Sequence, residues 1–170
     1  MLLPRVTALR QQLHRSPEIA HEEVQTAASV ANWLAENAPG LMPLAAGVGG
    51  GTGLLFRVDG SLASSDGHPS VLLRAELDGL PLVEASGVPH ASTTVGRHHA
   101  CGHDGHTAML AAALALLHSH RSEWAGVVFG LFQPAEETGT GAAAVLADKS
   151  AMAALAGAGA VGRAFSSKSS

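Results

Sequence analysis

The sequence predicts an α/β fold, in which helices pack against a central β-sheet. Two short apolar runs have the length of buried strands: residues 71–73, which continue into 74–78, and residues 127–132. Between them, residues 107–118 are almost entirely alanine and leucine, which is typical of a helix packed on a sheet. Strands that alternate with helices form layered α/β structures, whose sites lie beyond the carboxyl ends of the strands.

The N-terminal third is expected to contribute two helices and a further strand. Apolar residues recur at helical spacing over residues 6–13 and again, after a break at Pro17, over residues 24–34. Pro39 and the glycine after it end the second helix. The glycine-rich segment 47–60 lacks the spacing of a dinucleotide-binding loop and any Gly-Lys-Ser/Thr, so it predicts a tight entry into a strand. We expect that strand at residues 54–58.

The composition is that of one domain with a hydrophobic core. Hydrophobic residues make up 46% and charged residues 14% of the 170 positions, which argues against intrinsic disorder. The net charge of −4 gives no electrostatic reason to expect nucleic acid or an anionic membrane as a partner. The longest apolar run, residues 108–117, is too short to cross a bilayer. Without an evident signal peptide or a possible internal disulfide, we expect a cytoplasmic protein.

Residues 98–106, His-His-Ala-Cys-Gly-His-Asp-Gly-His, concentrate metal-binding groups in nine positions. Cys101 and His103 are two residues apart, so in extended backbone both side chains face one side. Thiolate and imidazole are the usual donors for zinc and related divalent metals. A lone cysteine is more often a small core residue, but four neighbouring histidines favour a metal. Asp104 is expected either to cap a helix that begins near Gly105 or to orient a ligating imidazole.

Four other histidines are expected to take no part in the site. His118 and His120 lie at the end of a predicted helix, where cations interact favourably with the dipole and with unsatisfied carbonyls. His14 and His68 have no partner that the sequence reveals.

Glu136 and Glu137 follow the strand predicted at 127–132 after Gln-Pro-Ala. Adjacent acidic residues usually form a solvated surface, but at a strand end one carboxylate can turn toward a metal while its neighbour faces the substrate. Hydrolysis of an amide needs both roles, because a metal lowers the pKa of bound water and a carboxylate transfers its proton to the leaving amine. Glu76 and Asp78 follow the other strand in the same way.

Three segments resemble, in order and spacing, the dinuclear-metal amidohydrolases of metallopeptidase type. They are RAELDGLP at 74–81, HHACGHDGHTAML at 98–110 and GLFQPAEETGTGA at 130–142, preceded by LHRSPEIAHEE at 13–23. The family includes hippurate hydrolase, N-acyl-amino-acid amidohydrolases and plant hydrolases of indole-3-acetyl-amino-acid conjugates. The resemblance implies a zinc-peptidase-like catalytic domain with a mixed central sheet flanked by helices. It also implies hydrolysis of the amide bond of N-acyl amino acids or short peptides.

The resemblance further implies two divalent ions and a role for each site residue. Cys101 would bridge the ions, His103 and Glu137 would be further ligands, and Glu136 would be the general base. Asp78 would lie close to the metals without binding them. Zinc, manganese, cobalt and nickel all suit such a mixed set of donors. The chain departs from the family pattern at Glu76, where aspartate is usual, and at Gly79, where alanine is usual.

The resemblance also implies that the catalytic domain is incomplete here. The family takes further histidine ligands downstream of the glutamate pair, and no histidine follows His120. Residues 1–147 would form the N-terminal part of the domain, and 148–170 an Ala/Gly/Ser-rich tail produced by truncation or frameshift, in which 160–165 is a candidate strand start. The family's inserted lid and dimerisation domain would be absent. We therefore expect an inactive fragment that holds at most one divalent ion tightly.

Two other functions stay open at this point. One is a non-catalytic, metal-binding remnant of the same fold. The other is a thiol hydrolase with Cys101 as nucleophile and a histidine base. It is the weaker of the two, because His103 is only two residues away and no oxyanion or orienting partner is evident.

Overall fold

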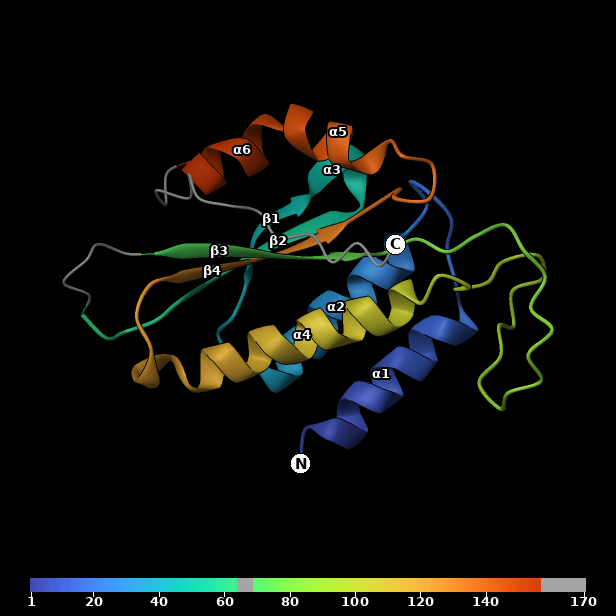
Figure 1. Ribbon diagram of the computed structural model, residues 1–170, viewed down its shortest axis with the longest axis horizontal. Helices are drawn as coiled ribbons and strands as arrows, with labels where there is room; N and C mark the ends of the chain where they lie inside the picture. The colour runs from blue at the N-terminus through green and yellow to red at the C-terminus, as the bar shows by residue number, and fades with distance from the viewer. Residues whose placement is uncertain (64–68, 157–170) are drawn as a thin grey trace.

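A computed structural model describes residues 1–63 and 69–156 of the chain and shows a four-stranded mixed sheet (Figure 1). The strands are β1 (Pro43–Gly47), β2 (Gly53–Asp59), β3 (Ser70–Glu76) and β4 (Val127–Gln133), in the order β1-β2-β4-β3. β2 runs antiparallel to both β1 and β4, whereas β3 and β4 are parallel. The α/β prediction and the mixed sheet that the resemblance implies are confirmed.

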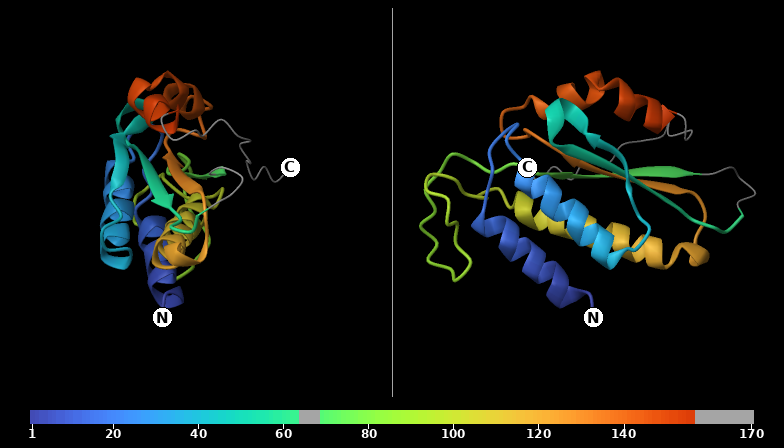
Figure 2. Two further views of the ribbon diagram at one scale, coloured as in Figure 1. Left: turned by 90° about the vertical axis from the view of Figure 1, so that its left-hand side faces the viewer. Right: turned by 180° about the vertical axis from the view of Figure 1, so that it is seen from behind.

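Helices cover both faces of this sheet (Figures 1 and 2). On one face lie α1 (Leu3–Arg15), α2 (Val24–Asn37) and α4 (His103–Ser119), and on the other α3 (Val48–Gly51), α5 (Gly141–Ala147) and α6 (Lys149–Ala156). A single 3₁₀ turn, η1 (Arg121–Glu123), leads from α4 toward β4. No helix in the described ranges combines the length and the apolar character that a membrane crossing needs.

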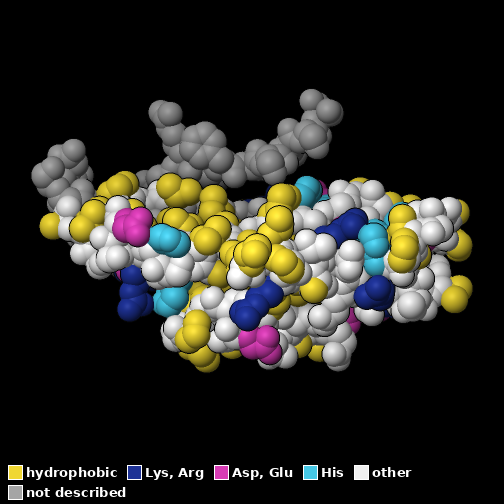
Figure 3. Space-filling model, turned by 90° about the horizontal axis from the view of Figure 1, so that it is seen from below, with side chains coloured by type: hydrophobic (Ala, Val, Ile, Leu, Met, Phe, Trp, Pro, Cys, Tyr) yellow, Lys and Arg dark blue, Asp and Glu magenta, His cyan; other side chains and the backbone are white. Residues whose placement is uncertain are grey.

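The larger core lies between the sheet and the three long helices. Phe56 of β2 and Phe132 of β4 pack edge to face, with their ring centroids 5.9 Å apart. Leu114 of α4 lies directly on β4 at Gly130, where an added Cβ would come within 2.5 Å of a leucine methyl carbon. This close approach holds α4 against the sheet. On the outer surface of the three helices, charged and histidine side chains are scattered among hydrophobic ones (Figure 3).

The ends of the predicted elements differ from those observed. The helix predicted at 107–118 begins earlier, at His103, because Gly102 adopts a left-handed conformation with φ of 82° and starts the helix there. The expected strands at 54–58, 71–78 and 127–132 are observed with shifted ends. The sequence did not reveal β1, because its Pro-Leu-Ala-Ala-Gly sequence has no β-branched or aromatic residue and depends on pairing with β2.

The first part of the segment 148–170, which we expected to be a tail, is helical. Residues 149–156 form α6, and Ala151 is fully buried in the smaller core with Val145 and Phe129. The rest of the expected tail, including the candidate strand start at 160–165, lies outside the described residues.

The topology brings the conspicuous sequence segments to one edge. Because β3 and β4 are parallel, their carboxyl ends meet at the same edge of the sheet. The N-terminus of α4 lies at that edge as well (Figure 1). The long connection between β3 and α4, residues 77–102, also lies there, and its two ends are joined by a bridge between Leu80 and His98.

Candidate metal centre

Three segments distant in sequence supply the side chains of this centre. Asp78 follows β3, His103 is the first residue of α4, and Glu136 and Glu137 follow β4. His103 Nε2 lies 3.7 Å from Glu136 Oε2, and His103 Nδ1 lies 3.7 Å from Glu137 Oε1. These three residues each offer a ligand atom within 4.8 Å of the others. The separation suits a cation bound between them.

The ring of His103 is held in place by its Nδ1 atom. Nδ1 donates a hydrogen bond of 2.8 Å to the backbone oxygen of Asp78, and the ring is buried. A histidine anchored in this way presents Nε2 to a metal ion. Burial opposes protonation, but the carboxylates of Asp78 and Glu76 outweigh it and raise the pKa of His103 to about 9. The pocket therefore attracts positive charge.

Asp78 braces the glutamate pair. Its Oδ2 accepts a hydrogen bond of 2.9 Å from the backbone nitrogen of Glu137. Burial raises the pKa of Asp78, but the hydrogen bonds from His103 and the glutamate backbone outweigh this and lower it overall. The buried carboxyl is thereby kept ionised.

Several buried polar atoms at this centre accept no hydrogen bond within the described part of the chain. They include Asp78 Oδ1 and Glu137 Oε1. Buried carboxylate oxygens are nearly always hydrogen-bonded, so an orphaned pair beside an imidazole needs an explanation. A divalent ion would satisfy Glu137 Oε1, and the charge of Asp78 Oδ1 beside it would favour a cation. The residues present at this centre therefore fit a metal.

His99 is a further buried group without a hydrogen-bond partner among the described residues. Neither ring nitrogen has one, and the ring is only 3% exposed. Burial lowers the pKa of His99 to about 4, although Asp104 opposes the shift. The imidazole is consequently neutral at physiological pH.

Cys101 lies beside Glu137 but outside the compact group of donors. It sits in a turn and is exposed. The extended geometry expected for Cys101 and His103 is wrong, because Gly102 is left-handed and His103 already belongs to the helix. A hydrogen bond to the Glu137 carboxylate, with some burial, raises the pKa of Cys101 to about 11. A protonated thiol in acidic surroundings is a poor nucleophile, which argues against a thiol hydrolase.

Alkylation of Cys101 is therefore expected to be slow in the metal-free chain. Only the thiolate reacts, and a raised pKa lowers the thiolate fraction at pH 8 by roughly tenfold or more. The rate of reaction with iodoacetamide, followed by mass spectrometry, should climb as the pH approaches 11. Glu137→Gln should accelerate it at pH 8, while the exposed and distant Glu123→Gln should not. Equal rates in the parent and Glu137→Gln chains would show that this carboxylate does not control the thiol.

Asp104 does not cap α4, and the imidazole that it contacts is that of His14. Its Oδ2 forms an ion pair with Arg10 Nε at 2.6 Å and accepts a hydrogen bond of 2.8 Å from His14 Nδ1. His14, expected to have no partner, is therefore buried in a polar cluster. Arg10 and His14 are four residues apart and share one face of α1, a spacing that the sequence does show.

Glu76 and His106 also belong to this neighbourhood, although no role was predicted for either. His106 Nδ1 lies 2.9 Å from Glu76 Oε2, and together with His103 they form a second compact group of donors. His103 and His106 are three residues apart on one helical face, which is the sequence signal for this pair.

Three further histidines, His68, His118 and His120, were expected to take no part in the site. His120 lies exposed at the end of α4 and contacts the backbone oxygen of Leu116, as expected for a helix end. His118 is half-buried and contacts the backbone oxygen of Pro39. His68 lies outside the described residues.

Comparison with known proteins places the chain among metallopeptidases. The family model described as peptidase family M20/M25/M40 matches residues 72–165. N-acetyl-L-cysteine deacetylase of Bacillus subtilis is 39% identical over 140 residues, which are 82% of this chain and 32% of that protein. IAA-amino acid hydrolase ILR1-like 5 of Arabidopsis thaliana is 40% identical over 139 residues, which are 81% of this chain and 29% of that protein.

A solved structure agrees with these sequence matches. The dinuclear metal binding peptidase of the M20 family from Bacillus subtilis superposes with a TM-score of 0.77 at 34% identity. The match covers 88% of this chain and 40% of that one. The chain thus spans about a third of the length of the curated relatives it matches. Since the family model covers more than half of the chain and the solved structure shares its fold, the chain belongs to peptidase family M20/M25/M40.

Proposed function

We propose that this centre binds a divalent metal. In a protein containing the whole catalytic domain, it would hydrolyse the amide bond of N-acyl amino acids or short peptides. The observation that carries the proposal is the pair of buried carboxylate oxygens beside His103, Asp78 Oδ1 and Glu137 Oε1, which accept no hydrogen bond within the described part of the chain. The activities for which the relatives are named, deacetylation of N-acetylcysteine and hydrolysis of IAA-amino acids, support this substrate class.

The metal would be held by His103, Glu137 and Cys101. When bound, it supplies a Lewis acid that polarises the substrate carbonyl and acidifies a water molecule. Asp78 positions two of these ligands, since its backbone oxygen anchors the His103 ring and its Oδ2 anchors the backbone of Glu137. Anchored ligands hold the site in the geometry that the metal needs.

Glu136 is the general base in this proposal. Its side chain is 40% exposed, whereas that of Glu137 is 15% exposed, so the two neighbours face different environments. Glu136 Oε2 can accept a proton from water on the open side and donate it to the nitrogen of the leaving amine. Its distance of 3.7 Å from His103 Nε2 places it next to the ligands.

Residues 1–147 form the N-terminal part of the catalytic domain in this proposal. Three donors, Cys101, His103 and Glu137, are fewer than two ions sharing a site require. We therefore expect the 170-residue chain to hold one ion tightly at this centre and to turn over substrate negligibly. If a version with the whole catalytic domain also failed to hydrolyse substrate, the result would favour the alternative that the fold is a non-catalytic, metal-binding remnant.

Hydrolysis assays test the proposed function. N-acetyl amino acids and hippurate are incubated with the 170-residue chain, and with a version that contains the whole catalytic domain, in the presence of manganese or zinc. The longer version should release the amino acid, lose this activity with a chelator and recover it when metal is restored. Chelator-resistant hydrolysis would contradict the metal-dependent mechanism. Robust turnover by the 170-residue chain would contradict the expectation that the site needs further donors.

A further inference from the structure

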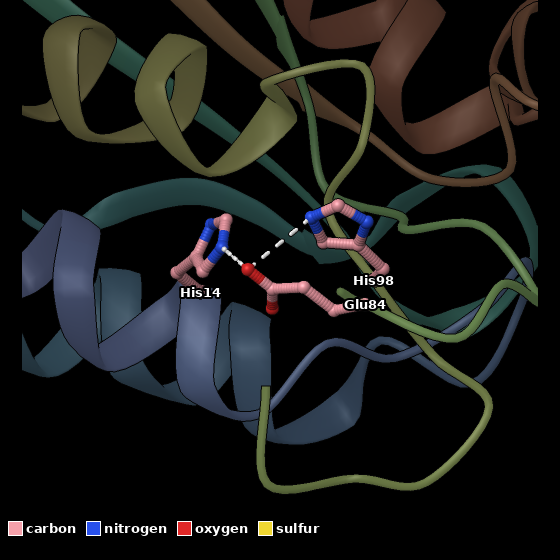
Figure 4. Close-up of side chains that lie close together, drawn as sticks. All are labelled: His14, Glu84 and His98. Atoms are coloured by element: carbon pink, nitrogen blue, oxygen red, sulfur yellow. Dashed lines mark hydrogen bonds and ion pairs between the residues drawn. The ribbon is translucent and has the colours of Figure 1, made fainter. Parts of the chain in front are cut away.

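A second cluster of metal-binding side chains lies at the end of α1, apart from the centre described above. It consists of His14 from α1 with Glu84 and His98 from the loop 77–102 (Figure 4). The side chains of His14 and Glu84 are 6% and 3% exposed, and that of His98 is 21% exposed. Figure 4 shows the Glu84 carboxylate between the two rings, with one oxygen directed at a nitrogen of each.

The distances in this cluster are those between ligands of a small cation. Glu84 Oε1 lies 3.1 Å from His14 Nε2 and 3.6 Å from His98 Nε2. Tetrahedral zinc bonds of about 2.0–2.1 Å place neighbouring ligand atoms about 3.3 Å apart. The two observed distances lie on either side of this value, so the side chains would need to move little to bind an ion.

The hydrogen bond that His14 Nδ1 makes to Asp104 leaves His14 Nε2 as an acceptor that faces another acceptor, Glu84 Oε1. His14 Nδ1 donates to Asp104 Oδ2 at 2.8 Å, so Nε2 of the neutral ring carries only a lone pair. That lone pair faces a carboxylate oxygen at 3.1 Å. Two acceptors at this distance require a proton or a cation between them.

The surrounding contacts resemble the support that metal-binding histidines receive. A carboxylate behind the ring fixes its tautomer and makes it a better ligand. Asp104 provides this carboxylate and is itself held by Arg10 Nε at 2.6 Å. Glu84 is held too, because its Oε2 accepts a hydrogen bond of 2.6 Å from the backbone nitrogen of Ser92.

We propose that His14 Nε2, His98 Nε2 and Glu84 Oε1 bind zinc or a similar divalent transition metal at a second, structural site. The partly exposed side of His98 leaves a fourth position open to solvent. The ion fastens α1 to two distant points of the loop 77–102, whose end carries Cys101. Two adjacent residues of α4 connect the sites. The ring of His103 contacts the Asp78 carboxyl at the first centre, and the carboxylate of Asp104 contacts His14 at the second. With one ion at each site, the chain would hold two ions, whereas the sequence alone led us to expect at most one.

Metal binding to a chain without the first centre tests this proposal. Cys101→Ser combined with Glu137→Gln removes donors of that centre only. Equilibrium dialysis with zinc should still give one ion per chain, and bound zinc should raise the melting temperature. Cobalt bound to this variant should show d–d absorption, which reports coordination by the remaining nitrogen and oxygen donors.

Substitutions within the second cluster complete the test. His98→Gln and Glu84→Gln, each added to the same background, should weaken zinc binding by roughly tenfold or more. His118→Gln, which replaces a histidine near the other end of α4, should leave binding unchanged. Circular dichroism establishes that each variant is folded. Absence of zinc binding in the background variant, or equal affinity after His98→Gln, would overturn the proposal and leave a proton between His14 and Glu84.

Discussion

Glu136→Gln is expected to lower turnover by about two to four orders of magnitude, the range for loss of a general acid–base group. The amide has the shape of the carboxylate but cannot accept a proton from water. Metal content should stay unchanged, because the exposed Glu136 side chain is not a proposed ligand. The measurement combines steady-state hydrolysis of an N-acyl amino acid, in a version with the whole catalytic domain, with metal analysis of the purified protein.

Glu137→Gln provides the matched control for this prediction. It makes the same chemical change one residue later, but it removes a proposed ligand whose buried oxygen accepts no hydrogen bond from the described residues. Bound metal should fall in this variant, and turnover should fall as a consequence. If both substitutions changed metal stoichiometry equally, the separate roles of Glu136 and Glu137 would be wrong.

Glu23→Ala is expected to reduce the free energy of unfolding by about 3 kcal/mol, since a buried donor left unsatisfied costs about 1–3 kcal/mol. Glu23 is fully buried, and its two oxygens accept hydrogen bonds from Thr52 Oγ1 at 2.7 Å and from the backbone nitrogen of Ala135 at 2.8 Å. Ala135 has a φ of 52°, an unusual conformation for a residue with a Cβ. Glu23 therefore holds the turn that leads into Glu136.

Urea denaturation of the 170-residue chain measures this effect, with Glu22→Ala as the control. Glu22 precedes Glu23, is exposed, and pairs with Arg97 at 2.8 Å on the surface. Loss of an exposed ion pair costs about 0–1 kcal/mol. Glu23→Gln retains one carbonyl acceptor and should fall between the two. Equal stability of the Glu22→Ala and Glu23→Ala chains would show that the buried hydrogen bonds do not support the fold.

The sequence predicted the elements whose patterns are local. Apolar runs and helical periodicity identified β2, β3, β4 and the three long helices, because burial against a sheet imposes those patterns on the sequence itself. The predicted strand ends indicated a site near Asp78, Glu136 and Glu137, because sites of α/β sheets lie beyond the carboxyl ends of the strands. The parallel pairing of β3 and β4 brings these ends together. The start of α4 at His103 was missed, because it depends on the left-handed conformation of Gly102.

By itself, then, the sequence determined the fold class and the family, and it predicted the donors that we propose for the first centre, because these rest on residue type and spacing along the chain. The direction of Asp104 and the burial of His14 were decided only by the tertiary structure. His14 is 70 residues from Glu84 and 90 from Asp104, and no spacing rule joins positions so far apart. Packing of α1 against α4 and the loop 77–102 brings them together, and with them the second metal site that we propose.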